Sequence, residues 1–78
     1  SLEVESGRFD EAQKLVGEVL VKNPRDVDAL LLRGNLALQR SDPTAAIADL
    51  RAVLRDQPDA AGVMRTLARA HLANGEPA

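Results

Sequence analysis

The chain has 78 residues, a formal net charge of −2, 45% hydrophobic residues and one aromatic residue, Phe9. A chain of this length forms one small domain at most. It contains no cysteine, which excludes a disulfide framework, a thiolate zinc site and a cysteine nucleophile. The acidic balance argues against nucleic acid as a partner, and no apolar run approaches the ~20 residues that span a bilayer. Leu and Ala dominate the apolar residues, so the composition predicts a helical protein.

The first element expected along the chain is a helix over residues 10–22, where apolar side chains recur at helical spacing. Residues 1–6 are interpreted as the tail of a separate preceding helix, with Gly7 as the left-handed residue that caps it. Asn23-Pro24 ends the helix over 10–22, because the residue before a proline is pushed out of the α region.

Two further helices are expected on either side of Ser41-Asp42-Pro43. One runs over about residues 26–40 and the other over about 43–56. Asp42 is placed to cap free backbone amides, and Pro43 at the first helical position loses no hydrogen bond. This sequence therefore ends one helix and begins the next.

The last helix is expected over about residues 60–73, after a stop at Gln57-Pro58. Asn74-Gly75 follows it as a C-cap signal. The chain is therefore built from helical hairpins.

The hairpins repeat with a period of 34 residues. Prolines, small residues and large apolar residues coincide when the sequence is laid on itself at that offset. The coinciding pairs include Pro24 and Pro58, Ala12 and Ala46, Val19 and Val53, Leu20 and Leu54, Leu30 and Met64, and Leu38 and Leu72. A fixed period of this size indicates stacked repeats. We predict an all-α fold, an α-solenoid of antiparallel helix-turn-helix repeats, with a full repeat at residues 25–58 and partial repeats at 1–24 and 59–78.

One complete repeat covers about residues 27–60 and places large apolar, small and closing residues in a fixed order. These residues are Leu30, Gly34, Ala46, Leu50, Val53 and Pro58. In them the chain resembles the tetratricopeptide repeat family. It departs from the family's pattern at Arg33, which stands in a slot usually filled by leucine, and at Ala37 and His71, which replace a usual aromatic residue. The resemblance implies about two stacked repeats, each covering its neighbour.

The resemblance also implies a peptide ligand on the concave surface made by the first helix of each repeat. Carried over by position, the binding residues are Asp28, Leu31, Asn35, Leu38 and Gln39 from one helix and Arg65, Arg69 and Leu72 from the next. Two arginines facing an asparagine suit a carboxylate or an acidic peptide. The alternative is that both arginines are simply solvated. The carboxylate-clamp pattern of chaperone-binding members is not met, because leucines occupy positions 31 and 32.

The residues that carry chemistry elsewhere have a structural interpretation here. His71 is the only histidine, and no nucleotide-binding, zinc-protease or Ser-His-Asp arrangement accompanies it. Asp26, Asp28, Asp56 and Asp59 lie at expected helix ends, where capping explains them; a divalent-metal site is the alternative. We predict no enzymatic activity, no cofactor and no metal.

Five leucines of the second helix cannot share one amphipathic face, since consecutive residues point ~100° apart. They are Leu30, Leu31, Leu32, Leu36 and Leu38. Either neighbouring helices cover this helix on two sides, or it presents an apolar patch to a partner or to another copy of the chain.

Two functions follow. The first is a non-enzymatic scaffold that binds a peptide or protein segment in the groove between first helices. The second is self-association, in which chains pair end to end or exchange helices to complete a longer stack, giving a homo-oligomer. The expected contacts for self-association are Leu2, Val4, Leu15 and Val16 at one end and Met64, Leu67 and Leu72 at the other. The Ala-, Leu- and Arg-rich composition fits a bacterial source, in the cytoplasm or the periplasm.

Overall fold

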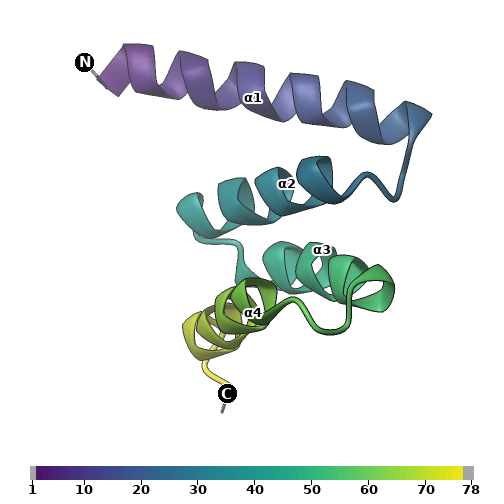
Figure 1. Ribbon diagram of the computed structural model, residues 1–78. Coiled ribbons are helices and arrows are strands. Elements are labelled where there is room, and N and C mark those ends of the chain that lie inside the picture. The colour runs from purple at the N-terminus through teal and green to yellow at the C-terminus, as the bar shows by residue number, and fades with distance from the viewer. Residues whose placement is uncertain (1, 77–78) are drawn as a thin grey trace.

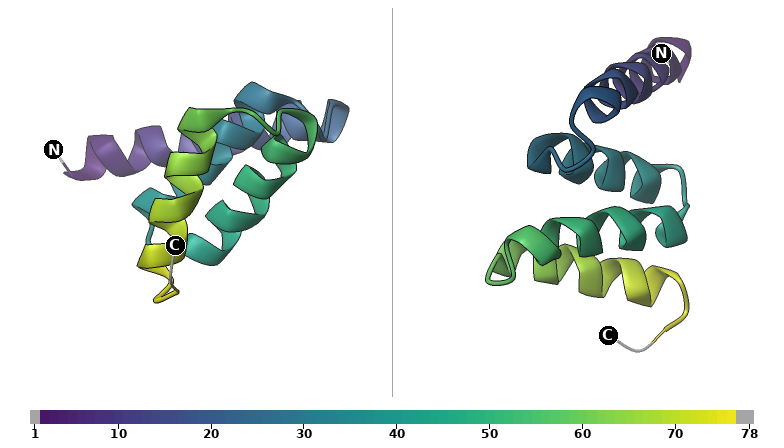
Figure 2. Two further views of the ribbon diagram at one scale, coloured as in Figure 1. Left: turned by 60° about the horizontal axis from the view of Figure 1, so that its bottom comes forward. Right: turned by 90° about the vertical axis from the view of Figure 1, so that its right-hand side faces the viewer.

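The computed structural model describes the backbone of residues 2–76 and the side chains of residues 7–76. Within these residues the chain forms α1 (Leu2–Lys22), α2 (Val27–Gln39), α3 (Pro43–Asp56) and α4 (Ala61–Ala73) (Figure 1). The helices follow one another as layers, with α1 at one end of the stack and α4 at the other (Figure 2). No strand occurs in the described backbone, and the expected all-α helical repeat of about two units is confirmed.

The expected break at Gly7 is wrong, because α1 runs through it without interruption. The residues at the same repeat position, Ser41 and Gly75, do follow a helix end and have positive φ angles of 64° and 76°. Each of them is followed by an acidic residue and a proline in the sequence, whereas Gly7 is followed by Arg8 and Phe9. Without a capping acid or a proline, nothing stops the helix, and a mid-helix glycine costs only about 1 kcal/mol.

Aspartates cap the two central helices as the sequence suggests. The Asp26 carboxylate accepts a hydrogen bond from the Ala29 amide at 2.9 Å, and Asp42 accepts one from the Ala45 amide at 3.2 Å. Pro43 is the first residue of α3. Both ends of α2 and α3 therefore fall within one residue of their expected places.

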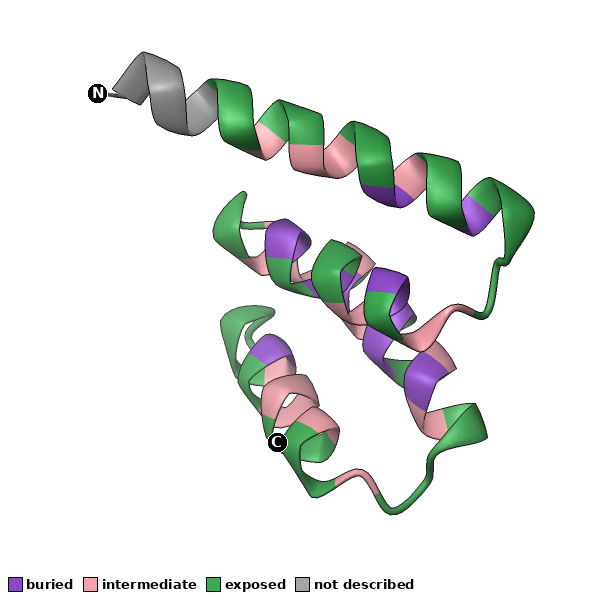
Figure 3. Ribbon diagram, turned by 45° about the horizontal axis from the view of Figure 1, so that its top comes forward, coloured by how far each residue is buried: buried purple, intermediate pink, exposed green. Residues whose placement is uncertain are grey.

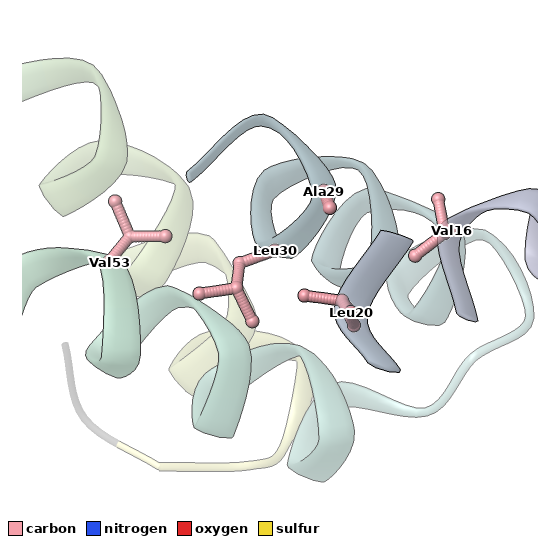
Figure 4. Close-up of a cluster of buried hydrophobic side chains, with 5 residues drawn as sticks. All are labelled: Val16, Leu20, Ala29, Leu30 and Val53. Carbon is pink, nitrogen blue, oxygen red and sulfur yellow. The ribbon is translucent and has the colours of Figure 1, made fainter. Parts of the chain in front are cut away.

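The core consists of two clusters that share the middle of the stack. In the first, Leu30 of α2 lies between Leu20 of α1 and Val53 of α3 (Figure 4). The second joins α2, α3 and α4 through Leu50, which is fully buried. Its other buried members are Ala37, Ala46 and Ala70. Helices α2 and α3 are thus covered on two sides, whereas much of α1 is exposed (Figure 3).

Two-sided cover accounts for most of the leucine-rich stretch in α2. Leu30 and Leu36 are buried, and Leu31 and Leu38 are half-buried against the core clusters. Leu32 differs, since 45% of it remains exposed. Among the described residues, no helix has the length and apolar character needed to cross a membrane.

Candidate functional site

An opening of 290 Å³ lies between α2 and α4. Its lining is mainly apolar and includes Leu31 from α2, Leu50 from α3 and Val63 from α4. Asn35 and Thr66 add an amide and a hydroxyl, and Gly62 completes the lining. This combination suits an apolar side chain that is oriented by a few hydrogen bonds.

A second opening of 640 Å³ adjoins the first along α4, because Gly62 and Thr66 line both. Here Arg65 and Arg69 supply positive charge. The Thr66 hydroxyl donates to the Gly62 carbonyl at 3.0 Å, and the Arg69 guanidinium lies 3.4 Å from the Thr66 hydroxyl oxygen. Neither arginine forms an ion pair within the described side chains.

The residues expected to form the groove fall into three groups. Leu31 and Asn35 line the first opening, and Arg65 and Arg69 line the second. Gln39 lines a different opening, between α1 and α2, where it accompanies Phe9. The remaining three residues line none of these openings: Asp28 and Leu72 are exposed, and Leu38 packs on the core.

Leu50, Gly62, Val63 and Thr66 were not among the expected groove residues. Gly62 and Thr66 occupy the same face of α4, four residues apart. Gly62 and Thr66 are each three residues before one of the two arginines, which places them on the same side of the helix. The sequence therefore contained the information needed to predict them. For Leu50 it contained none, because Leu50 belongs to α3 and lines the opening between α2 and α4 from a buried position.

A second feature missed by sequence analysis is an ion pair between α2 and α3. Arg33 donates two hydrogen bonds to Asp49, at 2.9 Å from Nε and 2.7 Å from Nη2. The Asp49 side chain is only 7% exposed, whereas that of Arg33 is 44% exposed. These hydrogen bonds raise the pKa of Arg33. At the position where the family usually has a leucine, Arg33 therefore holds α2 against α3 through an ion pair with a buried carboxylate.

Two of the four aspartates expected at helix ends have local partners. Asp26 caps α2, and Asp56 accepts hydrogen bonds from the Arg25 guanidinium. In the described part of the chain, no group of three or more His, Asp or Glu side chains is arranged to hold a metal ion.

His71 takes part in the cap of α4. Its Nδ1 lies 2.9 Å from Oε2 of Glu76, and the other carboxylate oxygen, Oε1, accepts a hydrogen bond from the Asn74 side-chain amide. The hydrogen bond from Asn74, followed by that from His71, lowers the pKa of Glu76. Both groups therefore fix the turn after α4.

Comparison with known families agrees with this architecture. The tetratricopeptide repeat family model matches residues 1–61 and again residues 31–78. The chain belongs to the tetratricopeptide repeat family. Tetratricopeptide repeats are in general protein–protein interaction modules and typically form non-enzymatic scaffolds. No curated protein and no solved structure matches the chain.

In the repeat division predicted from the sequence, α2 and α3 are the two helices of one repeat, and α4 is the first helix of the next. The opening with Leu31 and Asn35 therefore lies between two first helices. Boundaries at residues 24/25 and 58/59 stay a prediction.

Proposed function

We propose that the chain is a non-enzymatic scaffold that binds an extended, acidic segment of a partner protein along α2 and α4. The observation that carries this proposal is the adjacency of an apolar opening and a pair of arginines without acidic partners among the described residues. Among the residues that would otherwise suggest chemistry, His71, Asp26 and Asp56 have structural partners.

The apolar opening supplies the anchor. Its floor of Leu31, Leu50 and Val63 removes an apolar side chain from water, which is favourable by about 25 cal/mol per Å². The amide of Asn35 and the hydroxyl of Thr66 can then pair with the backbone of an extended segment. An opening of 290 Å³ fits one large side chain rather than a folded surface.

The arginines select the charge of the segment. A guanidinium binds a carboxylate through two parallel hydrogen bonds, and such charged hydrogen bonds are stronger than neutral ones. Arg65 and Arg69 are four residues apart on α4 and both are exposed, so successive acidic residues of an extended segment can reach them. Because the contacts are exposed, affinity falls as salt concentration rises.

The test uses isothermal titration with short synthetic peptides that carry one leucine flanked by acidic residues. A matched peptide has lysine in place of each acidic residue. We expect binding of the acidic peptide only, and loss of that binding in Arg65→Ala/Arg69→Ala. The matched control is Arg51→Ala/Arg55→Ala, which removes the same charge and the same i, i+4 pair from α3, outside the groove. If both double variants lose peptide affinity equally, the effect comes from net charge alone, and the groove is not the binding site.

A further inference from the structure

The exposed face of α1 has a buried counterpart in α3. In α3, the residues Ala46, Asp49 and Val53 are 0%, 5% and 0% exposed. Thirty-four residues earlier stand Ala12, Leu15 and Val19, of which Leu15 is 54% and Val19 is 42% exposed. The difference arises because α2 covers this face of α3 and the described chain places no equivalent helix on α1. We call Ala12, Leu15 and Val19, with Lys22 at their end, the α1 face.

A partly exposed face of α4 has its buried counterpart in α2. Leu30 is buried at 4% exposure in the cluster that joins α2 to α3, whereas its repeat equivalent on α4, Met64, is 44% exposed. Ala37 is fully buried, whereas its equivalent, His71, is only half-buried. Leu67 lies between them, half-buried against the second core cluster. We call Met64, Leu67 and His71, with Asp59 just before α4, the α4 face.

The two faces are related as α2 is to α3. The α4 face repeats the surface with which α2 packs on α3, and the α1 face repeats the surface that α3 offers to α2. If α4 of one copy packs on α1 of another, the joint therefore reproduces the helix pair inside the complete repeat. The sizes of the facing residues match as well. A Cβ built on Gly34 lies 3.6 Å from the Leu50 side chain. At the joint Ala68, which is larger than Gly34, would face Val16, which is smaller than Leu50.

Two ion pairs hold α2 and the turn before it against α3, and in each pair both residues are replaced at the equivalent positions of the joint. Arg33 pairs with Asp49, and their equivalents are Leu67 on α4 and Leu15 on α1. A charged pair thus becomes an apolar pair, with neither partner left mismatched. Exposure of Leu15 makes it available for such a contact.

The second ion pair is reversed in sign. Arg25 pairs with Asp56, and their equivalents are Asp59 before α4 and Lys22 at the end of α1. A joint between α4 and α1 would bring Asp59 beside Lys22, again as opposite charges. The joint would therefore pair leucine with leucine at the position of Arg33 and Asp49, and opposite charges at the position of Arg25 and Asp56.

We propose that copies of this chain associate head to tail, with the α4 face of one copy packed on the α1 face of the next. In this joint Leu67 contacts Leu15 of the next copy, and Asp59 pairs with its Lys22. Such a contact joins two different surfaces, so each added copy leaves one face open and the assembly continues to grow. Leu31 and Gly62 line the same opening between α2 and α4. Their repeat equivalents across the joint are Arg65 and Asp28 of the next copy, so the same placement brings these two opposite charges near each other.

The test measures molar mass by size-exclusion chromatography with light scattering over a tenfold range of concentration. We expect the wild-type mass to increase with concentration. Leu15→Asp and Leu67→Arg should each weaken association by about tenfold or more, because each places an unpaired charge in the joint. Mixing the two variants should restore growth, because the mixture recreates the Arg33–Asp49 pair across the joint. Val21→Asp is the control, since Val21 is 84% exposed and lies outside the α1 face.

Charge reversal gives an independent measurement if Leu67→Arg impairs folding, which circular dichroism detects. Lys22→Glu and Asp59→Lys should each reduce the mass, and their combination in one chain should restore it. A wild-type chain that stays monomeric over the whole range would overturn the proposal. So would a dimer that does not grow, or a mass unchanged by all four substitutions. None of these four residues lines the openings beside Leu31 or Arg65, so peptide binding can be measured on the variants that no longer associate, and the two proposals can fail separately.

Discussion

Helices α1 and α3 occupy equivalent positions of the repeat, yet α3 buries an aspartate where α1 exposes a leucine. Asp49 is 5% exposed and Leu15 is 54% exposed. The residue types alone would predict the opposite arrangement. The difference comes from the neighbours: α3 has a helix on each side, and Arg33 of α2 neutralises its carboxylate.

The comparison shows that the burial of a residue in this stack is determined by the position of its helix in the stack rather than by the residue type. A central helix can accommodate a charge because its neighbours supply a partner for it. In α1 the same position carries a leucine, where the described chain supplies no neighbouring helix and no partner for a charge. Variants that alter the central helices and the end helices separately therefore test the comparison.

The largest expected effect is at the centre of the stack. Leu50→Ala removes a fully buried side chain that joins three helices, so we expect a loss of about 3 kcal/mol in the free energy of unfolding. The equivalent change on α1, Val16→Ala, should reduce it by about 1 kcal/mol, because a smaller side chain is lost. Urea denaturation followed by circular dichroism measures both. Equal losses would mean that α1 is held as firmly as α3.

A second variant converts the central ion pair into the leucine pair carried by the end helices. Arg33→Leu leaves Asp49 buried without a partner, and we expect it to lower the free energy of unfolding by about 3 kcal/mol. Arg33→Leu/Asp49→Leu should recover to within about 1 kcal/mol of the wild type, because no charge is left buried and the two leucines pack against each other. Urea denaturation again gives the values.

The control for this pair is Asp49→Leu alone. Its effect should be smaller than that of Arg33→Leu, because the Arg33 side chain is 44% exposed and water can solvate the released guanidinium. If both single variants lose equally and the double variant loses their sum, the two residues do not act as a pair.

The sequence predicted the fold well because its signals are local and repeated. Asp42 and Pro43 fix the junction between α2 and α3, and the 34-residue period fixes how the hairpins stack. The one wrong boundary, at Gly7, came from extending the period to a position where the stop signal was missing. Periodicity predicts that two positions are equivalent, but capping residues decide whether a helix ends at each.

The candidate site was less accessible to sequence analysis. Leu31, Asn35, Arg65 and Arg69 were expected in the groove, and they line the two adjoining openings. Gln39 was also expected there, but it lies on the side of α2 that faces α1. The rotation of each helix about its own axis is set by packing across the stack, so residues at the edge of a helix face cannot be assigned from spacing alone.

The smallest expected effect concerns the crossing of α2 and α3. A Cβ built on Gly34 lies 3.6 Å from the nearest atoms of Asp49 and Leu50, which is an ordinary van der Waals distance. Gly34→Ala should therefore stabilise the protein by about 1 kcal/mol, because alanine is the better helix former. Gly17→Ala on α1 is the matched control, since nothing lies within 4 Å of its built Cβ. Urea denaturation should give equal gains. A gain at Gly17 combined with a loss at Gly34 would show that the central helices cross too closely for a methyl group, although Ala68 occupies the equivalent position on α4.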